Sequence, residues 1–318
     1  MKKIIGLLLL TAQLCFAQTY PLKAITVVVP YVPGGVSDGL ARSLAQRLTT
    51  SLNQPVLVEN KAGGNTLIGA SFVAKAPADG YTLLLTAEAT LTMNPMLYNK
   101  LPYDVDKNFS PIIALASIPQ AFVLSNTINV KDMKEFIALA KKNKDKFSYA
   151  NLGNGSTAHL NFELFEKEVN INLTSVPYKG ASAALNDLMG GHVDAMIVST
   201  GFVASQAKSG NLKVLAVAGN KRSPLLPEVQ TFKEAGIGGF QPSSWFALMG
   251  VAGTPNDVIE KLNSEINKLL KDPVFKAEQL DKFILEPIGG SPDNLKNLIK
   301  SDSSKWTQII KDMQLKLD

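Results

Sequence analysis

Residues 24–38, AITVVVPYVPGGVSD, decide the fold class of this chain. Residues 24–30 are almost continuously β-branched, as in a parallel strand that is buried on both faces. A glycine-containing turn follows, and leucines then recur at every fourth position from Leu40 to Leu52, which predicts a helix with one buried stripe. A strand that enters a helix through a short turn is the repeating unit of α/β proteins.

The same unit continues along the chain. Further strands are predicted at residues 55–59, 81–86, 120–124, 147–151, 173–177, 193–199 and 212–218. Helices are predicted at residues 69–75, 130–142, 157–168, 181–189 and 257–270, and after Ser291-Pro292. Because helices alternate with about nine strands, we predict an α/β fold with two doubly wound sheets rather than one very wide sheet.

The first seventeen residues, MKKIIGLLLLTAQLCFA, have the pattern of a secretory signal. Lys2 and Lys3 precede an apolar run over 4–14, and Ala17 is the small residue expected before a cleavage point. The apolar run is shorter than the roughly 20 residues that span a bilayer. A membrane anchor and a lipoprotein modified at Cys15 stay open as alternatives. We expect cleavage after Ala17 and an exported mature chain.

Composition excludes several classes of protein. The chain has 318 residues, of which 46% are hydrophobic and 19% charged, so it can bury a core and is not disordered. One cysteine and two histidines exclude a disulfide scaffold and leave few ligands for a transition metal, so no metal and no cofactor is predicted. The formal net charge is +5. The basic residues are spread along helix faces, which is not typical of a nucleic-acid-binding surface.

Two glycine turns lie between a strand and a helix, at residues 30–38 (PYVPGGVSD) and 151–159 (NLGNGSTAH). Glycine permits positive φ and lets a ligand approach the backbone closely. The first turn of a helix carries unpaired N–H groups and a partial positive charge, so it can hold an anion without a lysine. Ser37 or Asp38 is expected to cap the first helix, and Ser156 or Thr157 the second.

Catalytic and nucleotide-binding interpretations of these turns are weaker. Residues 153–158 loosely match a dinucleotide fingerprint, but the acid expected about 20 residues later is missing. Ser156 and His159 are three apart at one helix start and do not form a nucleophile–base–orienter arrangement. Asp38 either caps its helix or fixes the glycine turn by hydrogen bonds. Glu88 follows a strand end and is expected to be exposed; in a cleft it would repel carboxylates and attract an ammonium group.

Six stretches, in order over nearly the whole mature chain, resemble the Bug-type substrate-binding proteins of tripartite tricarboxylate transporters. They are ITVVVPYVPGGVSD (25–38), QPVLVEN (54–60), DGYTLLL (79–85), NP with LPY (94–95 and 101–103), VPYKG (176–180) and VAGTP (251–255). The sequence departs from the family pattern at residues 61–65, which lack a proline, and at Glu88. The resemblance implies a periplasmic-binding-protein-like fold of type II, with two lobes around a ligand cleft.

The resemblance also implies a division of the chain and a set of ligand contacts. The first lobe would comprise residues 18–122 and 226–318, and the second lobe residues 123–225. One wall of the ligand site would contain Tyr31, Pro33, Gly34, Gly35 and Asp38, and the other Gly155, Ser156, Thr157 and His159. Thr86, Lys179, Asp194 and Thr200 would contribute from strand ends that face the cleft.

The expected function is capture of a small carboxylate by closure of the two lobes. A di- or tricarboxylate is the first expectation, and an amino dicarboxylate is a subsidiary one. The resemblance implies delivery to a membrane permease with one large and one small integral subunit, and we expect a monomer that catalyses no reaction. A periplasmic module that presents its ligand to a sensory receptor, and an exported enzyme, are the alternatives.

Overall fold

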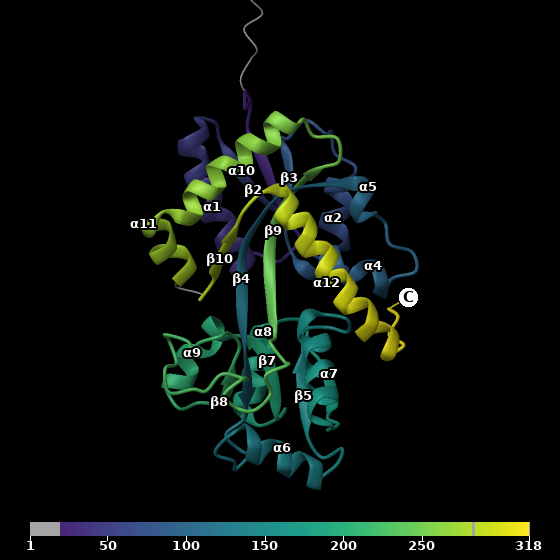
Figure 1. Ribbon diagram of the computed structural model, residues 1–318, viewed down its shortest axis with the longest axis vertical. Helices are drawn as coiled ribbons and strands as arrows, with labels where there is room; N and C mark the ends of the chain where they lie inside the picture. The colour runs from purple at the N-terminus through teal and green to yellow at the C-terminus, as the bar shows by residue number, and fades with distance from the viewer. Residues whose placement is uncertain (1–19, 282–283, 318) are drawn as a thin grey trace, which may run out of the picture.

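The computed structural model describes residues 20–281 and 284–317, so the predicted signal and its cleavage point lie outside the described residues. The chain forms an elongated molecule with an upper and a lower lobe (Figure 1). The fold class is α/β, as predicted.

The upper lobe is a mixed sheet flanked by helices. Its strands are β1 (Ile25–Val29), β2 (Val56–Asn60), β3 (Thr82–Ala87), β9 (Ser243–Val251) and β10 (Glu286–Gly289). Its helices are α1 (Val36–Leu52), α2 (Leu67–Ala74), α3 (Glu88–Thr92), α4 (Asn94–Leu97), α5 (Val105–Asn108), α10 (Asn256–Lys271), α11 (Pro273–Phe275), the π-helical turn η1 (Lys276–Leu280) and α12 (Pro292–Asp312).

The lower lobe is a smaller sheet between helices. Its strands are β5 (Ser148–Asn151), β6 (Thr174–Pro177), β7 (Ala195–Ser199) and β8 (Lys213–Val217). Its helices are α6 (Met133–Lys142), α7 (Thr157–Val169), α8 (Ala181–Gly190) and α9 (Thr200–Lys208). The pair β5–β6 and the pair β5–β7 are parallel, like β1 with β2 and β3 above, so both lobes contain the predicted strand–turn–helix units.

One long strand, β4 (Phe109–Leu124), runs through both lobes (Figure 1). Up to Pro119 it pairs with β9, and from Gln120 onward it pairs with β7 and β8. The strand order is β2-β1-β3-β9-β4-β7-β5-β6, with β8 and β10 also beside β4. The lobes are therefore joined through a continuous strand rather than through a flexible linker.

Each sheet is covered on both faces. In β1, Val27 packs with Leu44 of α1 in one apolar cluster, whereas the next residue, Val28, packs with Ala70 of α2 in another. The side chains of successive strand residues point to opposite faces, so this near-continuous apolar run is what a strand between two helix layers requires. Lower down β4, Phe122 and Val123 likewise belong to the clusters on opposite faces of the lower sheet.

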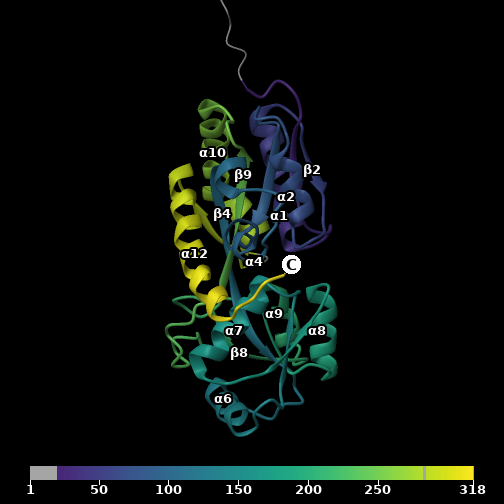
Figure 2. The ribbon, with the colours of Figure 1, turned by 90° about the vertical axis from the view of Figure 1, so that its right-hand side faces the viewer.

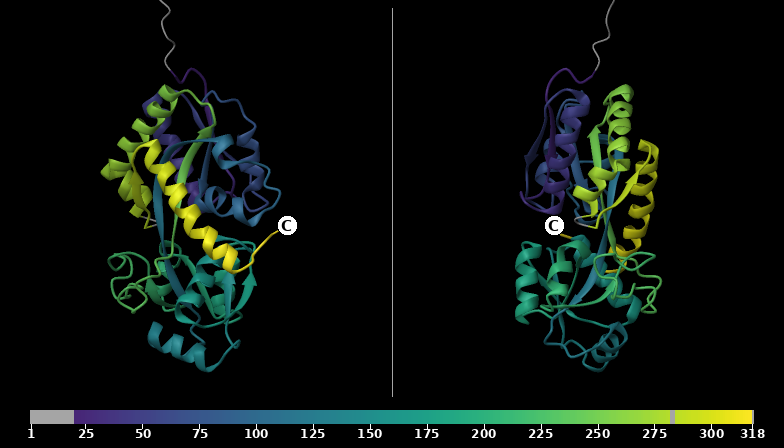
Figure 3. Two further views of the ribbon diagram at one scale, coloured as in Figure 1. Left: turned by 45° about the vertical axis from the view of Figure 1, so that its right-hand side comes forward. Right: turned by 90° about the vertical axis from the view of Figure 1, so that its left-hand side faces the viewer.

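A smaller apolar cluster, the junction cluster, connects the two lobes. It contains Ala89, Met93, Leu97, Leu160, Trp306 and Ile310, from α3, α4, α7 and α12. Helix α12 descends along the upper lobe to α7, and the segment after it turns toward the place where the lobes meet (Figures 2 and 3). The upper lobe thus contacts the start of α7 in addition to sharing β4.

The predicted lobe division at 122/123 and 225/226 stays a prediction. The pairing of β4 changes between Pro119 and Gln120, slightly earlier than the first predicted boundary. Phe232 and Phe240 pack in the lower lobe beside Phe165, which favours a second crossover later than residue 226.

Candidate functional site

The first glycine turn follows β1 and is fixed by a buried carboxylate. Gly34 has φ +88°, and its backbone N–H donates to Asp38 Oδ2 at 3.0 Å. The same oxygen accepts from Arg42 Nε at 3.0 Å, and Oδ1 accepts from Asn60 Nδ2 at 2.9 Å. Burial alone would raise the pKa of Asp38, but these hydrogen bonds hold it below its ordinary value. Asp38 is therefore ionised and stabilises the turn.

The expectation that Ser37 or Asp38 caps the first helix is wrong. Helix α1 begins at Val36, and its N-cap is Gly35, which has no side chain to accept a hydrogen bond. Asp38 lies three residues beyond the N-cap and points back to Gly34 instead. The alternative that Asp38 fixes the glycine turn is confirmed.

The second glycine turn follows β5 and has the same arrangement. Ser156 is the N-cap of α7, and its Oγ accepts from the backbone N–H of His159 at 3.3 Å, so capping by Ser156 is confirmed and capping by Thr157 is wrong. Gly155 has φ +75°, and its N–H donates to His159 Nδ1 at 3.0 Å. The other ring nitrogen, Nε2, lies 3.5 Å from Glu163 Oε1. The His159 side chain lowers the pKa of Glu163, against a smaller opposing effect of burial.

The two turns differ in which parts of their backbone a ligand can reach. A Cβ atom placed on Gly34, Gly35 or Gly153 would meet no atom of the described residues within 4 Å. A Cβ on Gly155 would lie 2.7 Å from Leu317 Cδ1 and 2.8 Å from Leu97 Cδ1. A ligand can therefore approach the first turn freely and the second turn at Gly153. Gly155 is covered, and its N–H is already used within the turn.

Both turns converge on the start of α3. On the upper side, the Tyr31 hydroxyl accepts from the backbone N–H of Ala87 at 3.1 Å, and burial raises the pKa of this phenol. Thr86, at the end of β3, is fully buried, and its Oγ1 lies 2.6 Å from Thr90 Oγ1. The next residue but one, Glu88, faces Thr157 at the start of α7. This chain of contacts brings the walls predicted from two distant turns to one place.

Glu88 is buried, so the expectation that it is exposed is wrong. Its exposed fraction is 2%, and Oε1 has no hydrogen-bond partner among the described residues. Burial raises the pKa of Glu88 well above its ordinary value, and the Asp302 carboxylate adds to this, whereas Lys305 and the Thr157 hydroxyl oppose it. The neutral acid is thereby favoured, and a neutral acid does not attract an ammonium group as an ionised Glu88 would.

The remaining predicted residues have different positions. Thr200, at the carboxyl end of β7, donates its hydroxyl to Pro119 O at 3.1 Å and ties the start of α9 to β4. Lys179, in the turn after β6, is exposed, as is Pro33 in the first turn. Because β5, β6 and β7 are parallel, Lys179, Thr200 and the second glycine turn share one edge of the lower sheet.

Asp194 lies at the opposite edge, so its predicted place facing the cleft is wrong. It precedes β7, level with Ser148 at the beginning of β5. Its Oδ2 accepts from the Ser148 N–H at 2.8 Å and from Ser148 Oγ at 3.0 Å. Asp194 therefore joins two strand beginnings and is remote from the second glycine turn.

Three residues that support the site were not predicted. Arg42 follows Asp38 by four positions on α1, a spacing from which their ion pair could have been predicted. Asn60 ends β2, beside the carboxyl end of β1, where the rule for strand ends in parallel sheets could have found it. Leu317 reaches Gly155 only through the tertiary structure, and its N–H donates to Leu97 O at 3.0 Å. No local sequence signal indicates that contact.

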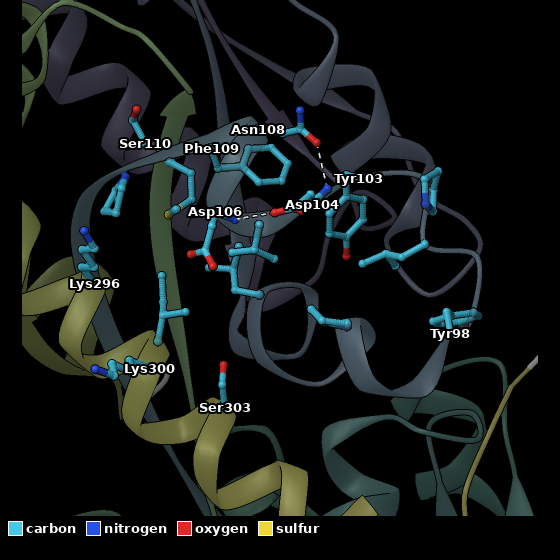
Figure 4. Close-up of a pocket in the computed structure, with 18 of the residues that line it drawn as sticks. Tyr98, Tyr103, Asp104, Asp106, Asn108, Phe109, Ser110, Lys296, Lys300 and Ser303 are labelled. Carbon is cyan, nitrogen blue, oxygen red and sulfur yellow. Dashed lines mark hydrogen bonds between the residues drawn. The ribbon is translucent and has the colours of Figure 1, made fainter.

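A large cavity of about 1270 Å³ lies elsewhere, between α12, residues 95–111 and Met249 (Figure 4). Lys296 and Lys300 lie on its α12 side, and Asp104 and Asp106 face them from around α5. All four charged residues are exposed, so the cavity offers no buried charge that would fix a ligand. No residue of either glycine turn lines it.

Residues 20–281 and 284–317 include no group of three or more His, Cys, Asp or Glu side chains that could hold a metal ion. Within the same residues, none of the helices combines the length and the apolar character needed to cross a membrane.

Comparison with known proteins connects this geometry to a family. The model of the tripartite tricarboxylate transporter family receptor matches residues 40–315. Protein BugT of Bordetella pertussis is 35% identical over 318 residues, which cover 99% of this chain and 97% of that protein.

Solved structures agree with the match. R. palustris Rpa4515 with adipate superposes with a TM-score of 0.85 at 32% identity and covers 92% of this chain and 98% of its own. The periplasmic binding protein BugD superposes with a TM-score of 0.81 at 34% identity, and the match covers 93% of this chain and 99% of BugD. MatC from Rhodopseudomonas palustris with bound malate superposes with a TM-score of 0.80 at 29% identity, and the match covers 92% of this chain and 100% of MatC.

Proposed function

Because the chain belongs to the family of tripartite tricarboxylate transporter receptors, which are periplasmic solute-binding proteins, we propose that it captures a small dicarboxylate between its lobes. The observation that carries this proposal is the pair of glycine turns, one in each lobe. Each has an exposed or half-exposed glycine backbone beside the N-terminus of a helix of at least 13 residues.

The chemistry of the turns matches two anionic groups rather than one. The first helical turns of α1 and α7 have N–H groups without an intrahelical acceptor, and the helix dipoles add partial positive charge there. One carboxylate would bind at Gly35 and the first turn of α1, beside Pro33, which has no N–H group, and Gly34, whose N–H already donates to Asp38. The other would bind at the first turn of α7, near Thr157, because the N–H of Gly153 donates to Asn151 Oδ1 and the N–H of Ser156 donates to Gly153 O. The adipate and malate bound by the two relatives are dicarboxylates, which supports the same class for this chain.

Other predicted residues have supporting roles in this proposal. Asp38 and His159 keep the two turns in shape, and Tyr31 holds the first turn against β3. Lys179 lies at the same sheet edge as the second turn and would attract an anionic ligand from solution. The neutral state favoured for Glu88 makes a di- or tricarboxylate a better candidate than an amino dicarboxylate.

Lobe closure would follow from binding. A ligand held by both turns gains contacts only in the closed arrangement, so it shifts an existing equilibrium between open and closed forms. We further propose that the mature protein is exported after cleavage behind Ala17, works in the periplasm without catalysing a reaction, and passes its ligand to a permease of one large and one small membrane subunit.

A thermal-shift screen of the purified protein tests the proposal. Adipate, malate and aspartate are compared with adipamide, which keeps the carbon chain of adipate but has no charge. A ligand that binds the native state stabilises it by about 2.7 kcal/mol at one hundred times its Kd, which raises the melting temperature by several degrees. We expect this rise with at least one dicarboxylate and none with adipamide. A rise with adipamide equal to that with the best dicarboxylate, or no response to any carboxylate, would contradict the proposal.

A further inference from the structure

Glu88 lies where three elements from both lobes meet. It is the first residue of α3 in the upper lobe, and it faces Thr157 at the start of α7 in the lower lobe. Asp302 and Lys305 approach it from α12. Its carboxyl group is enclosed, and Oε1 has no hydrogen-bond partner in the described part of the chain.

The enclosure of Glu88 depends on contact between the lobes. The Thr157 hydroxyl lies 3.9 Å from Met93 Sδ, and Leu160 of α7 packs in the junction cluster with Ala89 and Met93 beside Glu88. These contacts join α7 to α3 and α4. If the lobes separate at this junction, α7 withdraws and water reaches the carboxyl group.

The charges around Glu88 favour its neutral form while it is enclosed. Asp302 is held by a 2.6 Å hydrogen bond from Trp245 Nε1, so this second carboxylate stays near Glu88. Lys305 opposes its effect, but its ammonium group lies 4.6 Å from the ring centroid of Trp306 and is exposed.

Within residues 20–281 and 284–317, the other elements next to Glu88 place no lysine or arginine in direct contact with it. On α7, Thr157 has no charge, and the titratable side chain of the first turn, His159, contacts Gly155 and Glu163. From the first glycine turn, the titratable neighbour is the phenol of Tyr31. An ionised Glu88 would therefore have an unpaired oxygen in an apolar junction, which is costly, whereas in water the same charge is solvated.

We propose that Glu88 takes up a proton from water when the lobes close and releases it to water when they open, so that ligand capture and release respond to external pH. The lobe movement itself rests on the proposed function. Acid favours the closed form, and a higher pH favours the open form. A single linked proton changes the ratio of closed to open molecules by up to about tenfold for each pH unit.

Distance measurement between spin labels tests this without any ligand. Cys15 is the one cysteine of the sequence, so labels can be attached through Lys144→Cys in the lower lobe and Lys271→Cys in the upper lobe of a protein that lacks the signal segment. The distance distribution is recorded at pH 5 and at pH 8. With Glu88 present, we expect the population at the closed distance to fall at pH 8.

Two variants identify the group responsible. Glu88→Gln keeps the shape but cannot ionise, so its distance distribution should be the same at both pH values. Glu166→Gln is the matched control. Burial raises the pKa of Glu166 to about 8, but this carboxyl accepts from Leu173 N–H within the lower lobe, so the variant should respond to pH like the parent.

Two results would overturn the proposal: an unchanged distribution between pH 5 and pH 8 with Glu88 present, or the same pH response in Glu88→Gln as in the parent. Thermal unfolding of each variant checks that it is folded. Because the experiment uses no ligand, its failure leaves carboxylate capture standing. Failure of the thermal-shift screen in turn leaves this measurement interpretable.

Discussion

The backbone N–H of Gly155 donates a 3.0 Å hydrogen bond to Nδ1 of His159, and Gly34 donates in the same way to Asp38. In both turns the donor is the glycine before the N-cap, and the acceptor is the third residue of the helix. One acceptor is an imidazole nitrogen and the other a carboxylate oxygen, but both fix the conformation of their turn. Each holds a glycine at positive φ, so that the backbone of the turn is ordered before a ligand arrives.

Gly35→Val should weaken dicarboxylate binding by at least about tenfold, or 1.4 kcal/mol, with little loss of stability. Gly35 has φ −82°, which valine adopts, and a Cβ there meets no atom within 4 Å in the part of the chain that the structure describes, so the new side chain would occupy the space of the ligand. Calorimetric titration measures the affinity. Gly238→Val is the control, since among the described residues a Cβ there would contact only the Lys233 side chain, at 3.8 Å. Equal affinity in Gly35→Val and the control would contradict the placement of the ligand.

His159→Phe should destabilise the protein by about 1–3 kcal/mol, because the buried Gly155 N–H loses its acceptor while the ring volume is nearly kept. Urea unfolding at pH 7.5 measures the change. His192→Phe is the comparison, since His192 lies in the turn after α8 and outside the buried core. If both variants lose the same small amount of stability, the hydrogen bond does not stabilise the turn.

Asp38→Asn should lower the free energy of unfolding by about 1.5–3 kcal/mol at pH 7. The variant lacks the charged carboxylate that accepts hydrogen bonds from the Gly34 N–H and from Arg42 Nε. The pKa of Asp38 is lower in the folded protein than in the unfolded chain, so its contribution is present above the unfolded pKa and is lost as the pH falls through the folded value. The difference between variant and parent should therefore shrink below about pH 4. A constant difference from pH 7 to pH 3 would contradict this assignment.

Glu88→Gln should have the opposite pH dependence. The folded pKa of Glu88 is raised, so the contribution of its neutral form is complete below the unfolded pKa and is lost as the pH rises toward the folded one. We expect Glu88→Gln to be more stable than the parent at pH 8, by about 1.4 kcal/mol for each unit of the raised pKa crossed, and to be about equal to it at pH 4. Chemical unfolding at the two pH values decides this. A variant that is less stable than the parent at pH 8 would show that Glu88 is ionised in the folded protein.

The sequence predicted the fold class and the two turns because both depend on local patterns. The apolar run before Gly34 and the leucine repeat after it are complete within one strand–turn–helix unit, and the structure confirms them. Capping of α7 by Ser156 could also be predicted from the sequence, because capping involves residues only three apart.

The parts that could not be predicted depend on the packing of distant segments. Glu88 follows a strand end, where the local sequence predicts exposure; it is buried because α12 of its own lobe and α7 of the lower lobe cover it. Leu317 covers Gly155 from the end of the chain, 162 positions away (317 − 155). Asp194 shows a different error, because residues that precede a parallel strand lie at the edge opposite to those that follow it.

A crystal structure of the protein soaked with a dicarboxylate such as adipate tests the central claim most directly. We predict one carboxylate within hydrogen-bond distance of backbone N–H groups around Gly35 and the other near Thr157, with both lobes in contact with the ligand. Adipate bound instead in the cavity beside α12, between Lys296 and Asp106, with both glycine turns unoccupied, would contradict the account.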